Sequence, residues 1–414
     1  MHTLWLASWY PNRTDPFNGD FVQRHALSLA TRGPLTVIHV AKEGRAARAA
    51  GRTAPRDAAA TPGAGRAADT LTRRGNLTER ISYVRDPGAR RSFWNKLVSQ
   101  VRVFRAYDRA FRAHRRENGR PDLLHVHVCM NAGVFALWAQ WRWGIPFVVT
   151  EHYSIYVPGS PDDFYSRPFL YRYVNRMILR RARAVHSVSR FLLERMSAVA
   201  PLRATVVVPN AVDTTLFRAG LAAVGAAGAA TGAAPFRFIH VSGFQPLKNV
   251  PGILDAFALL ASRRRDWELV LIGPAGEDIR AYAASKDLGG HLHWTGEVSY
   301  AVVAEWLRSA GALVHFSWVE NQPCVISEAL CCGVPVVAAA VGGIPEVVRP
   351  GGDPAAGNGI LVPSKDVQAL AQALQQMMDN TYDRAGLARA AAAIYAYEAV
   401  GEALAAFEAK ATHS

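Results

Sequence analysis

Two glutamates and a lysine are the residues of this sequence whose types and spacing best suit binding chemistry. Glu320 and Glu328 are the first and last residues of the segment ENQPCVISE, and Lys248 follows the predicted turn SGFQPL. Carboxylates accept hydrogen bonds from sugar hydroxyl groups, and an ammonium group balances the charge of a phosphate. The residues around both glutamates are largely apolar, which argues against an ordinary solvated acidic face.

Pro323 predicts where a helix begins, because proline is favoured at the first helical position, where its missing N–H is not needed. The following residues, CVISEALCC, continue as a predicted helix. The N–H groups of Cys324 and Val325 would point out of the helix start and, with the helix dipole, form an anion site suited to a diphosphate. Glu328 would lie about 7 Å further along the helix axis than the helix start, a position suited to ribose hydroxyls.

The elements that must position these residues follow a regular alternation of strand and helix patterns, the first helix covering residues 19–32. Near-continuous apolar strands suit parallel sheets with both faces covered by helices. The predicted strands are residues 3–8, 35–40, 123–128, 147–150, 184–187, 205–208, 237–241, 268–272, 292–295, 312–316 and 334–338.

The chain is long enough for two domains, since it has 414 residues and is 50% hydrophobic. We expect an N-terminal domain at residues 1–218, an Ala- and Gly-rich linker at 219–235 and a C-terminal domain at 236–395. Residues 396–414 predict a C-terminal helix that packs back on the N-terminal domain. Residues 45–75 lack periodicity and predict a mobile surface loop.

The charge balance favours anionic partners, because the net charge is +14. Much of the excess is arginine within Ala- and Gly-rich sequence, which a biased coding composition would also produce. The sequence has no zinc finger, recognition helix or RNA-binding aromatic motif, so a nucleic-acid partner is not expected.

The chain also predicts a cytoplasmic protein that is at most peripheral at the inner face of a membrane. The spacing of its four cysteines fits neither a disulfide framework nor a zinc site. The N-terminus lacks the basic start of a signal peptide, and no apolar run is long enough to span a membrane.

Several motifs, in order along the chain, resemble those of the family 4 glycosyltransferases. They are ASWYPNRTDPFNGDFVQRHALSLATRG, PDLLHVHV, TEHYSIY, VVPNAVDTTLF, HVSGFQPLKNVPGILDAF, ENQPCVISEALCCGVPVVAAAVGGIPEVV and GNGILVP. The resemblance implies an α/β protein of GT-B architecture, with two Rossmann-like domains whose parallel sheets face each other across an interdomain cleft. It further implies a retaining transfer from a nucleotide-sugar donor that needs neither a metal nor another cofactor.

The resemblance also assigns roles to individual residues. It implies that Glu320, Lys248 and His152 are catalytic, with His152 facing the transferred sugar. The implied donor-binding residues are Gly19, Gly243, Lys248, Glu320, Asn321, Gln322, Pro323, Cys324, Val325 and Glu328. Relatives commonly carry an arginine at the position of Gly243, so one phosphate contact is missing here or comes from elsewhere.

Other polar residues near these motifs have structural interpretations beside the functional one. His125 and His127 are expected to be partly buried structural residues rather than metal ligands, because no carboxylate or cysteine completes a set. Glu346, in VGGIPEVV, lies near the donor in the family, but it could equally hold its own loop together. Gly19 could likewise mark an ordinary turn between strand and helix.

The acceptor side is expected in the N-terminal domain, where basic segments contain many aromatic residues. Phe93, Leu97, Val101, Phe104 and Phe111 lie near one face of a predicted helix. This face either packs on the sheet or rests on an anionic membrane and presents a lipid-linked sugar acceptor.

Other functions remain open at this point, namely a nucleotide-sugar epimerase, a sugar phosphorylase and a non-catalytic nucleotide-sugar-binding protein. The sequence also leaves the nucleobase, the sugar and the acceptor open.

Overall fold

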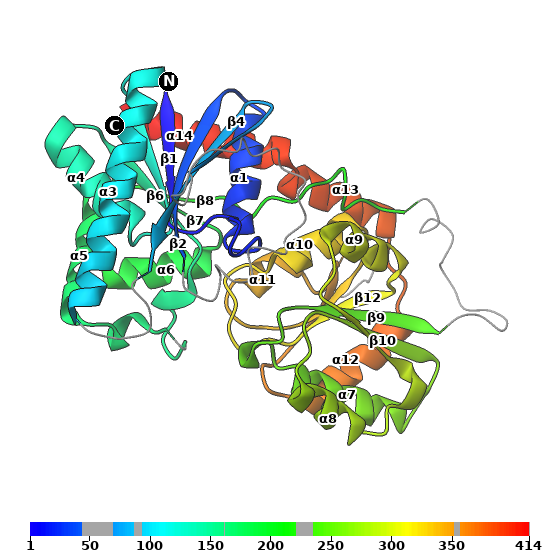
Figure 1. The fold of residues 1–414 in the computed structure, drawn as a ribbon. Coiled ribbons are helices and arrows are strands. Elements are labelled where there is room, and N and C mark those ends of the chain that lie inside the picture. The colour runs from blue at the N-terminus through cyan, green and yellow to red at the C-terminus, as the bar shows by residue number, and fades with distance from the viewer. Residues whose placement is uncertain (44–68, 87–92, 161, 221–234, 352–356, 414) are drawn as a thin grey trace. The chain divides into compact units, whose positions relative to one another are not determined.

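The computed structural model describes residues 1–43, 69–86, 93–160, 162–220, 235–351 and 357–413 (Figure 1). It divides into two compact units. Unit 1 contains Met1–Val188, Leu193–Val208 and Tyr397–Ser414, and unit 2 contains Ser189–Leu192 and Pro209–Ala396. Residues 209–218 therefore lie with unit 2, whereas the sequence boundary falls after residue 218.

Unit 1 is built on an eight-stranded sheet in the order β3-β4-β2-β1-β5-β6-β7-β8. All neighbouring strands are parallel except β3 and β4, which are antiparallel. The strands are β1 (Thr3–Ala7), β2 (Leu35–Glu43), β3 (Thr70–Arg74), β4 (Leu77–Arg85), β5 (Leu123–His127), β6 (Phe147–Glu151), β7 (Val185–Ser187) and β8 (Thr205–Val207). Strands β1, β5 and β6 are buried along their whole length, as expected for the centre of a covered parallel sheet.

The helices of unit 1 pack around this sheet. They are α1 (Asp20–Ala30), α3 (Phe93–Asn118), α4 (Ala132–Trp143), α5 (Phe169–Arg181), the part of α6 (Arg190–Val199) from residue 193, and α14 (Tyr397–His413). The C-terminal helix α14 packs against α1 and β5. It also contributes a buried carboxylate, Glu408, whose Oε1 accepts a hydrogen bond from Nε1 of Trp5 over 2.8 Å.

Unit 2 contains a fully parallel six-stranded sheet in the order β11-β10-β9-β12-β13-β14. Its strands are β9 (Phe236–Val241), β10 (Trp267–Ile272), β11 (Leu292–Gly296), β12 (Ala312–His315), β13 (Val336–Ala339) and β14 (Gly359–Val362). Its helices are α7 (Val250–Ala261), α8 (Glu277–Ala284), α9 (Tyr300–Ser309), α10 (Cys324–Cys331), α11 (Ile344–Val347), α12 (Val367–Asp379) and α13 (Arg384–Tyr395). The buried residues of this sheet are divided between two apolar clusters. For example, Val337 and Ala339 belong to one and Val336 and Ala338 to the other, as in a sheet covered on both faces.

The expected GT-B fold class, with a parallel sheet in each of two Rossmann-like domains, is confirmed. The strand predictions agree with the structure to within three residues at each end, the largest difference being at the end of β2, but β3, β4 and β14 were not predicted. The expectation of a mobile loop at residues 45–75 is wrong for its last part, because Thr70–Arg74 forms an edge strand that pairs with β4. Its sequence, TLTRR, contains a single apolar residue, Leu71, which is exposed, so the strand carries no apolar periodicity. Residues 45–68 lie outside the described residues.

The expected apolar face of α3 is divided in the structure. Phe111 is fully buried, whereas Leu97 and Val101 are among the exposed large hydrophobic residues. Only the second half of this helix buries the expected face. The side chain of Phe93 lies outside the described residues.

Candidate active site

Glu320 lies in the short segment of unit 2 between β12 and α10, and its carboxylate is surrounded by polar side chains. Nζ of Lys248 lies 2.6 Å from its Oε1 and Nε2 of His315 lies 2.8 Å from the same oxygen. Oγ of Ser317 lies 3.0 Å from that histidine nitrogen. Glu320 is only 8% exposed, so these contacts hold a nearly buried charge in one orientation.

The electrostatic environment keeps Glu320 ionised. Burial by itself would raise the pKa of Glu320, but the charge of Lys248, followed by the hydrogen bond and charge of His315, outweighs it. The pKa of Glu320 therefore lies well below its usual value. A permanently charged carboxylate suits the stabilisation of a developing positive charge better than it suits proton transfer at neutral pH.

Local structure explains how Lys248 reaches this position. Pro246–Lys248 forms a single turn of 3₁₀ helix, and Asn249 then begins α7, its side chain accepting a hydrogen bond from the N–H of Gly252. The backbone N–H of Trp318 donates to the carbonyl of Leu247 over 2.8 Å, which ties this turn to the segment containing Glu320. The lysine side chain remains 26% exposed, so it is accessible to a ligand as well as to the carboxylate.

The start of α10 is close to the prediction. The helix begins at Cys324, one residue after the predicted start, so Pro323 is the N-cap residue and not the first helical residue. Proline has no polar side chain, so Pro323 itself makes no capping hydrogen bond to this helix start. Glu328 lies in the interior of the helix and is 4% exposed, in a largely apolar environment. The helix start therefore keeps the features expected of an anion site, with one carboxylate before it and one inside it.

The structure gives two of the sequence candidates supporting roles. Oε1 of Gln322 accepts a hydrogen bond from the N–H of Asn210 over 2.6 Å, and Nδ2 of Asn210 donates to the carbonyl of Gln322. Gln322 thus fixes the backbone before α10. The carboxylate of Glu346 accepts hydrogen bonds from the N–H groups of Arg190 and Phe191, both over 2.8 Å. This geometry supports the structural interpretation of Glu346.

The glycine turn before Glu346, at Gly342 and Gly343, packs against the backbone of Glu320 and Asn321. Gly342 has a φ of +57°, and a Cβ built on it would lie 1.7 Å from the carbonyl oxygen of Glu320. Only glycine fits this position without strain. Asn321 is 8% exposed beside this turn, whereas Gly243 is exposed at the end of β9 and has no side chain to contact a phosphate.

The remaining two candidates, Gly19 and His152, belong to unit 1. Gly19 has a φ of +66°, and a Cβ there would lie 2.7 Å from the carbonyl carbon of Trp9, so local packing alone requires glycine. His152 follows β6 and is 9% exposed, with the ring of Phe21 centred 4.5 Å away. It lies at the carboxyl end of a parallel strand, where open α/β sheets bind ligands.

His152 is part of a larger group of buried histidines that the sequence did not predict. His25 from α1 and His127 from β5 lie beside it, with ring centroids 5.2 Å and 6.1 Å from that of His152. Both are fully buried, so the expectation that His127 is only partly buried is wrong. The three residues come from segments far apart in the sequence, and local spacing therefore carries no signal of the group.

His315 is a second residue that the sequence analysis missed. It is the last residue of β12 and lies five positions before Glu320. A histidine at the carboxyl end of a buried parallel strand is a signal that could have identified it.

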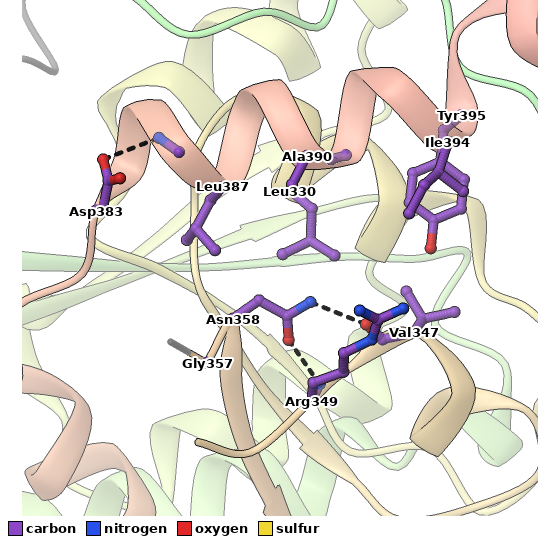
Figure 2. A pocket seen from close by; sticks show the side chains of 12 residues that line it. Leu330, Val347, Arg349, Gly357, Asn358, Asp383, Leu387, Ala390, Ile394 and Tyr395 are labelled. Carbon is purple, nitrogen blue, oxygen red and sulfur yellow. Dashed lines mark hydrogen bonds between the residues drawn. The ribbon is translucent and has the colours of Figure 1, made fainter. Parts of the chain in front are cut away.

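Figure 2 shows a separate pocket of about 200 Å³ in unit 2. It lies between α13, the end of α10, α11 and the start of β14. Asn358 donates to the carbonyl of Val347 and accepts from the N–H of Arg349, so its polar groups are engaged with neighbouring backbone. None of the predicted site residues lines it, and the pocket is not part of the candidate active site.

Comparisons with protein families match both halves of the chain. Residues 231–394 match the model described as "Glycosyl transferases group 1", and residues 48–211 match the "Glycosyl transferase 4-like domain". The D-inositol 3-phosphate glycosyltransferase of Kribbella flavida is 30% identical over 322 residues, which are 72% of each chain. The enzyme of the same name from an Arthrobacter species is 28% identical over 67% of each chain.

Solved structures with the same fold include a sucrose-phosphate synthase and HepE. Sucrose-phosphate synthase from Thermosynechococcus elongatus has a TM-score of 0.72 and 19% identity, covering 99% of both chains. HepE from Anabaena in complex with UDP has a TM-score of 0.69 and 17% identity, covering 99% of this chain and 100% of that one.

Proposed function

Because the chain belongs to the family 4 glycosyltransferases, we propose that it transfers a hexosyl group from a nucleoside diphosphate sugar to a hydroxyl acceptor, with retention and without a metal. Family membership favours transfer over the epimerase, phosphorylase and binding-protein alternatives. The observation that carries the proposal is the contact of Lys248 and His315 with one oxygen of the buried Glu320 carboxylate, next to the start of α10.

The donor fits unit 2 through three complementary groups. The start of α10 and Lys248 bind the diphosphate, Glu320 contacts the sugar, and Glu328 binds the ribose hydroxyls. A cation about 4 Å from a phosphate gains on the order of 4 kcal/mol at an effective dielectric near 20. That HepE forms a complex with UDP supports this class of donor.

The proposed reaction breaks the bond between the anomeric carbon and the phosphate oxygen and forms one to the acceptor oxygen on the same face. The leaving phosphate oxygen takes the proton of the acceptor hydroxyl. Lys248 and the helix start stabilise the charge of the leaving diphosphate. Glu320 stabilises the positive charge on the sugar ring, and His152 keeps the catalytic role that the family resemblance gives it.

The proposal is tested by following nucleoside diphosphate release from a panel of UDP-, GDP- and ADP-sugars, with and without a chelator. The acceptors should include sugars and an inositol phosphate, the latter because of the names of the relatives. One nucleotide is expected to support transfer in the presence of the chelator. Release that needs no acceptor, or that stops when the chelator is added, would contradict the proposal.

Lys248→Met should reduce this activity by about 10²–10³-fold, because it removes a preorganised charge at the leaving group. Lys286→Met is the matched control, since Lys286 also forms a 2.6 Å ion pair in unit 2 and its side chain has the same 26% exposure. An equal loss in both variants would point to a general structural effect.

We further propose that α5 lets the enzyme work at an anionic membrane that carries the acceptor. Phe169, Leu170 and Tyr173 are 71%, 69% and 55% exposed on α5, which also has arginines in its last turn. Such exposed apolar and basic residues favour an acidic lipid surface. Among the described helices, none is both long and apolar enough to cross a membrane.

Flotation with vesicles containing acidic lipid tests this part. Phe169→Ser with Leu170→Ser should reduce vesicle binding by about tenfold, since two apolar side chains no longer insert. Transfer to a water-soluble acceptor should be unchanged. Failure of the unmodified enzyme to float at low salt would exclude the membrane proposal.

A further inference from the structure

Three buried histidines of unit 1 bring their ring nitrogens together in a group suited to a metal ion. One nitrogen from each of His25, His127 and His152 lies within 4.8 Å of the others. The side chains come from α1, the last position of β5 and the residue after β6. Their exposed fractions are 0%, 0% and 9%, so solvent reaches only the third.

His127 indicates that the group is built for a ligand. Neither of its ring nitrogens has a hydrogen-bond partner among the described residues. A buried polar group without a partner is unfavourable, and native structures usually provide one. The neighbouring histidines His125 and His186 differ from His127, because both of their ring nitrogens are hydrogen-bonded. Those of His125 bond to Glu408 and Thr150, and those of His186 bond to Thr150 and to the Val208 carbonyl.

We propose that His25, His127 and His152 bind one divalent transition-metal ion, with Zn²⁺ as the reference ion, and leave a fourth position for water. Imidazole nitrogen is a preferred zinc ligand, and three histidines with one open position form a known type of tetrahedral site. Zinc–nitrogen bonds of about 2.0–2.1 Å place tetrahedral ligand atoms about 3.4 Å apart. Ring rotations that move each ligand nitrogen by about an ångström would bring the three nitrogens to this spacing around an ion.

The surroundings suit a bound cation. The ring of His125 is centred 4.3 Å from that of His127, and its Nδ1 lies 2.7 Å from the buried carboxylate of Glu408. This carboxylate supplies negative charge close to the group, and Phe21 covers His152 from outside.

Metal binding would have a consequence for catalysis. A metal-bound His152 would no longer be available for its proposed catalytic role, so Zn²⁺ should inhibit transfer, whereas a chelator should not reduce it. That consequence rests on the proposed function, but the binding site itself does not. Direct measurement of binding therefore separates failure of the site from failure of the proposed function.

The test uses the full chain, freed of metal by a chelator and titrated with Zn²⁺ by calorimetry. Bound metal is measured after gel filtration, and Co²⁺ absorption reports the coordination geometry. One ion per chain and a higher Tm with Zn²⁺ are expected. His127→Phe and His152→Ala should each weaken Zn²⁺ binding by at least about tenfold, because loss of even a residue that only supports a metal ligand has an effect of that size.

His114→Gln is the matched control, because Nε2 of His114 lies 2.9 Å from that of His2 in a second pair of histidines in unit 1. Binding should survive this change. Each variant is checked by circular dichroism and by nucleoside diphosphate binding. If His127→Phe fails to fold, His152→Ala at the edge of the group decides the question. Absence of Zn²⁺ binding, or binding unchanged in both variants, would overturn the proposal.

Discussion

The two units hold their polar groups in different ways. In unit 2 the buried Glu320 is paired with Lys248 and His315, within 2.8 Å of a single oxygen. In unit 1 the buried His127 lies among other imidazoles, and neither of its nitrogens has a hydrogen-bond partner among the described residues. Both groups lie at the carboxyl ends of parallel strands.

The difference follows from charge. A buried carboxylate without partners loses several kcal/mol of solvation, so a protein that keeps one must surround it with donors. A neutral imidazole loses much less, and it can remain open to a ligand. Unit 2 is therefore preorganised for charge stabilisation, whereas unit 1 is open for coordination or hydrogen bonding.

The largest expected effect is on turnover, when the paired carboxylate of unit 2 is removed. Glu320→Ala should lower kcat by about 10²–10³-fold, because the charge that stabilises the transition state is lost. Nucleoside diphosphate release under saturating donor measures it. Glu268→Ala is the control, since Glu268 also pairs with a cation of unit 2, Arg237, over 2.5 Å. Normal turnover in Glu320→Ala would remove its assigned role.

Two buried groups, His39 and Glu320, should respond to acid over different pH ranges. Burial lowers the pKa of His39 in unit 1 to about 4 from 6.5, despite its hydrogen bond to the Ala7 carbonyl. Below pH 6.5 the unfolded chain binds this proton and the folded chain does not, so stability falls as the pH drops to about 4, by up to about 3 kcal/mol. The pKa of Glu320 is instead lowered from 4.5, so its stabilisation is complete above that pH and is lost below it.

Urea unfolding between pH 7 and pH 3, followed by circular dichroism, measures this pattern. His39→Gln should show a weaker loss between pH 6.5 and pH 4, and Glu320→Gln should change only the loss below pH 4.5. If the unmodified protein and both variants lost stability in acid in the same way, His39 and Glu320 would not control that loss.

A smaller effect is expected from the residue that positions Glu320. His315→Ala should lower kcat by about 10–100-fold with little change in KM for the donor, because the carboxylate loses one of its two anchors. His315→Gln, which keeps a donor, should recover part of the activity. His291→Ala is the control, since that histidine bonds the carbonyl of Trp267, the first residue of β10, whereas His315 is the last residue of its parallel strand. Equal losses in the alanine and glutamine variants would indicate a purely structural role.

The smallest expected effect concerns the nucleotide. Glu328→Ala should weaken nucleoside diphosphate binding by about tenfold, the loss of one charge-assisted hydrogen bond, with little change in kcat. Calorimetry measures the affinity, and Glu305→Ala, an exposed glutamate of α9, is the control. Unchanged affinity would exclude the ribose role of Glu328.

The predictable part of the site lies within one short stretch of chain. Glu320, the start of α10 and Glu328 are close in sequence, so helix geometry alone brings them near one another. Lys248 could be added because it follows a strand that was recognised. The antiparallel strand β3 could not be predicted, since this edge strand, TLTRR, has one apolar residue and buries no apolar face.

The sequence by itself determined the two parallel sheets through apolar periodicity, and the family and the charged residues of the candidate donor site through motifs that resemble that family. Only the tertiary structure decided that His315 anchors Glu320, because spacing along an irregular segment does not fix which side chains face each other, and that His25, His127 and His152 meet. The three histidines come from a helix, a strand and a loop far apart in the sequence, and chain topology sets which side chains share the carboxyl edge of a sheet.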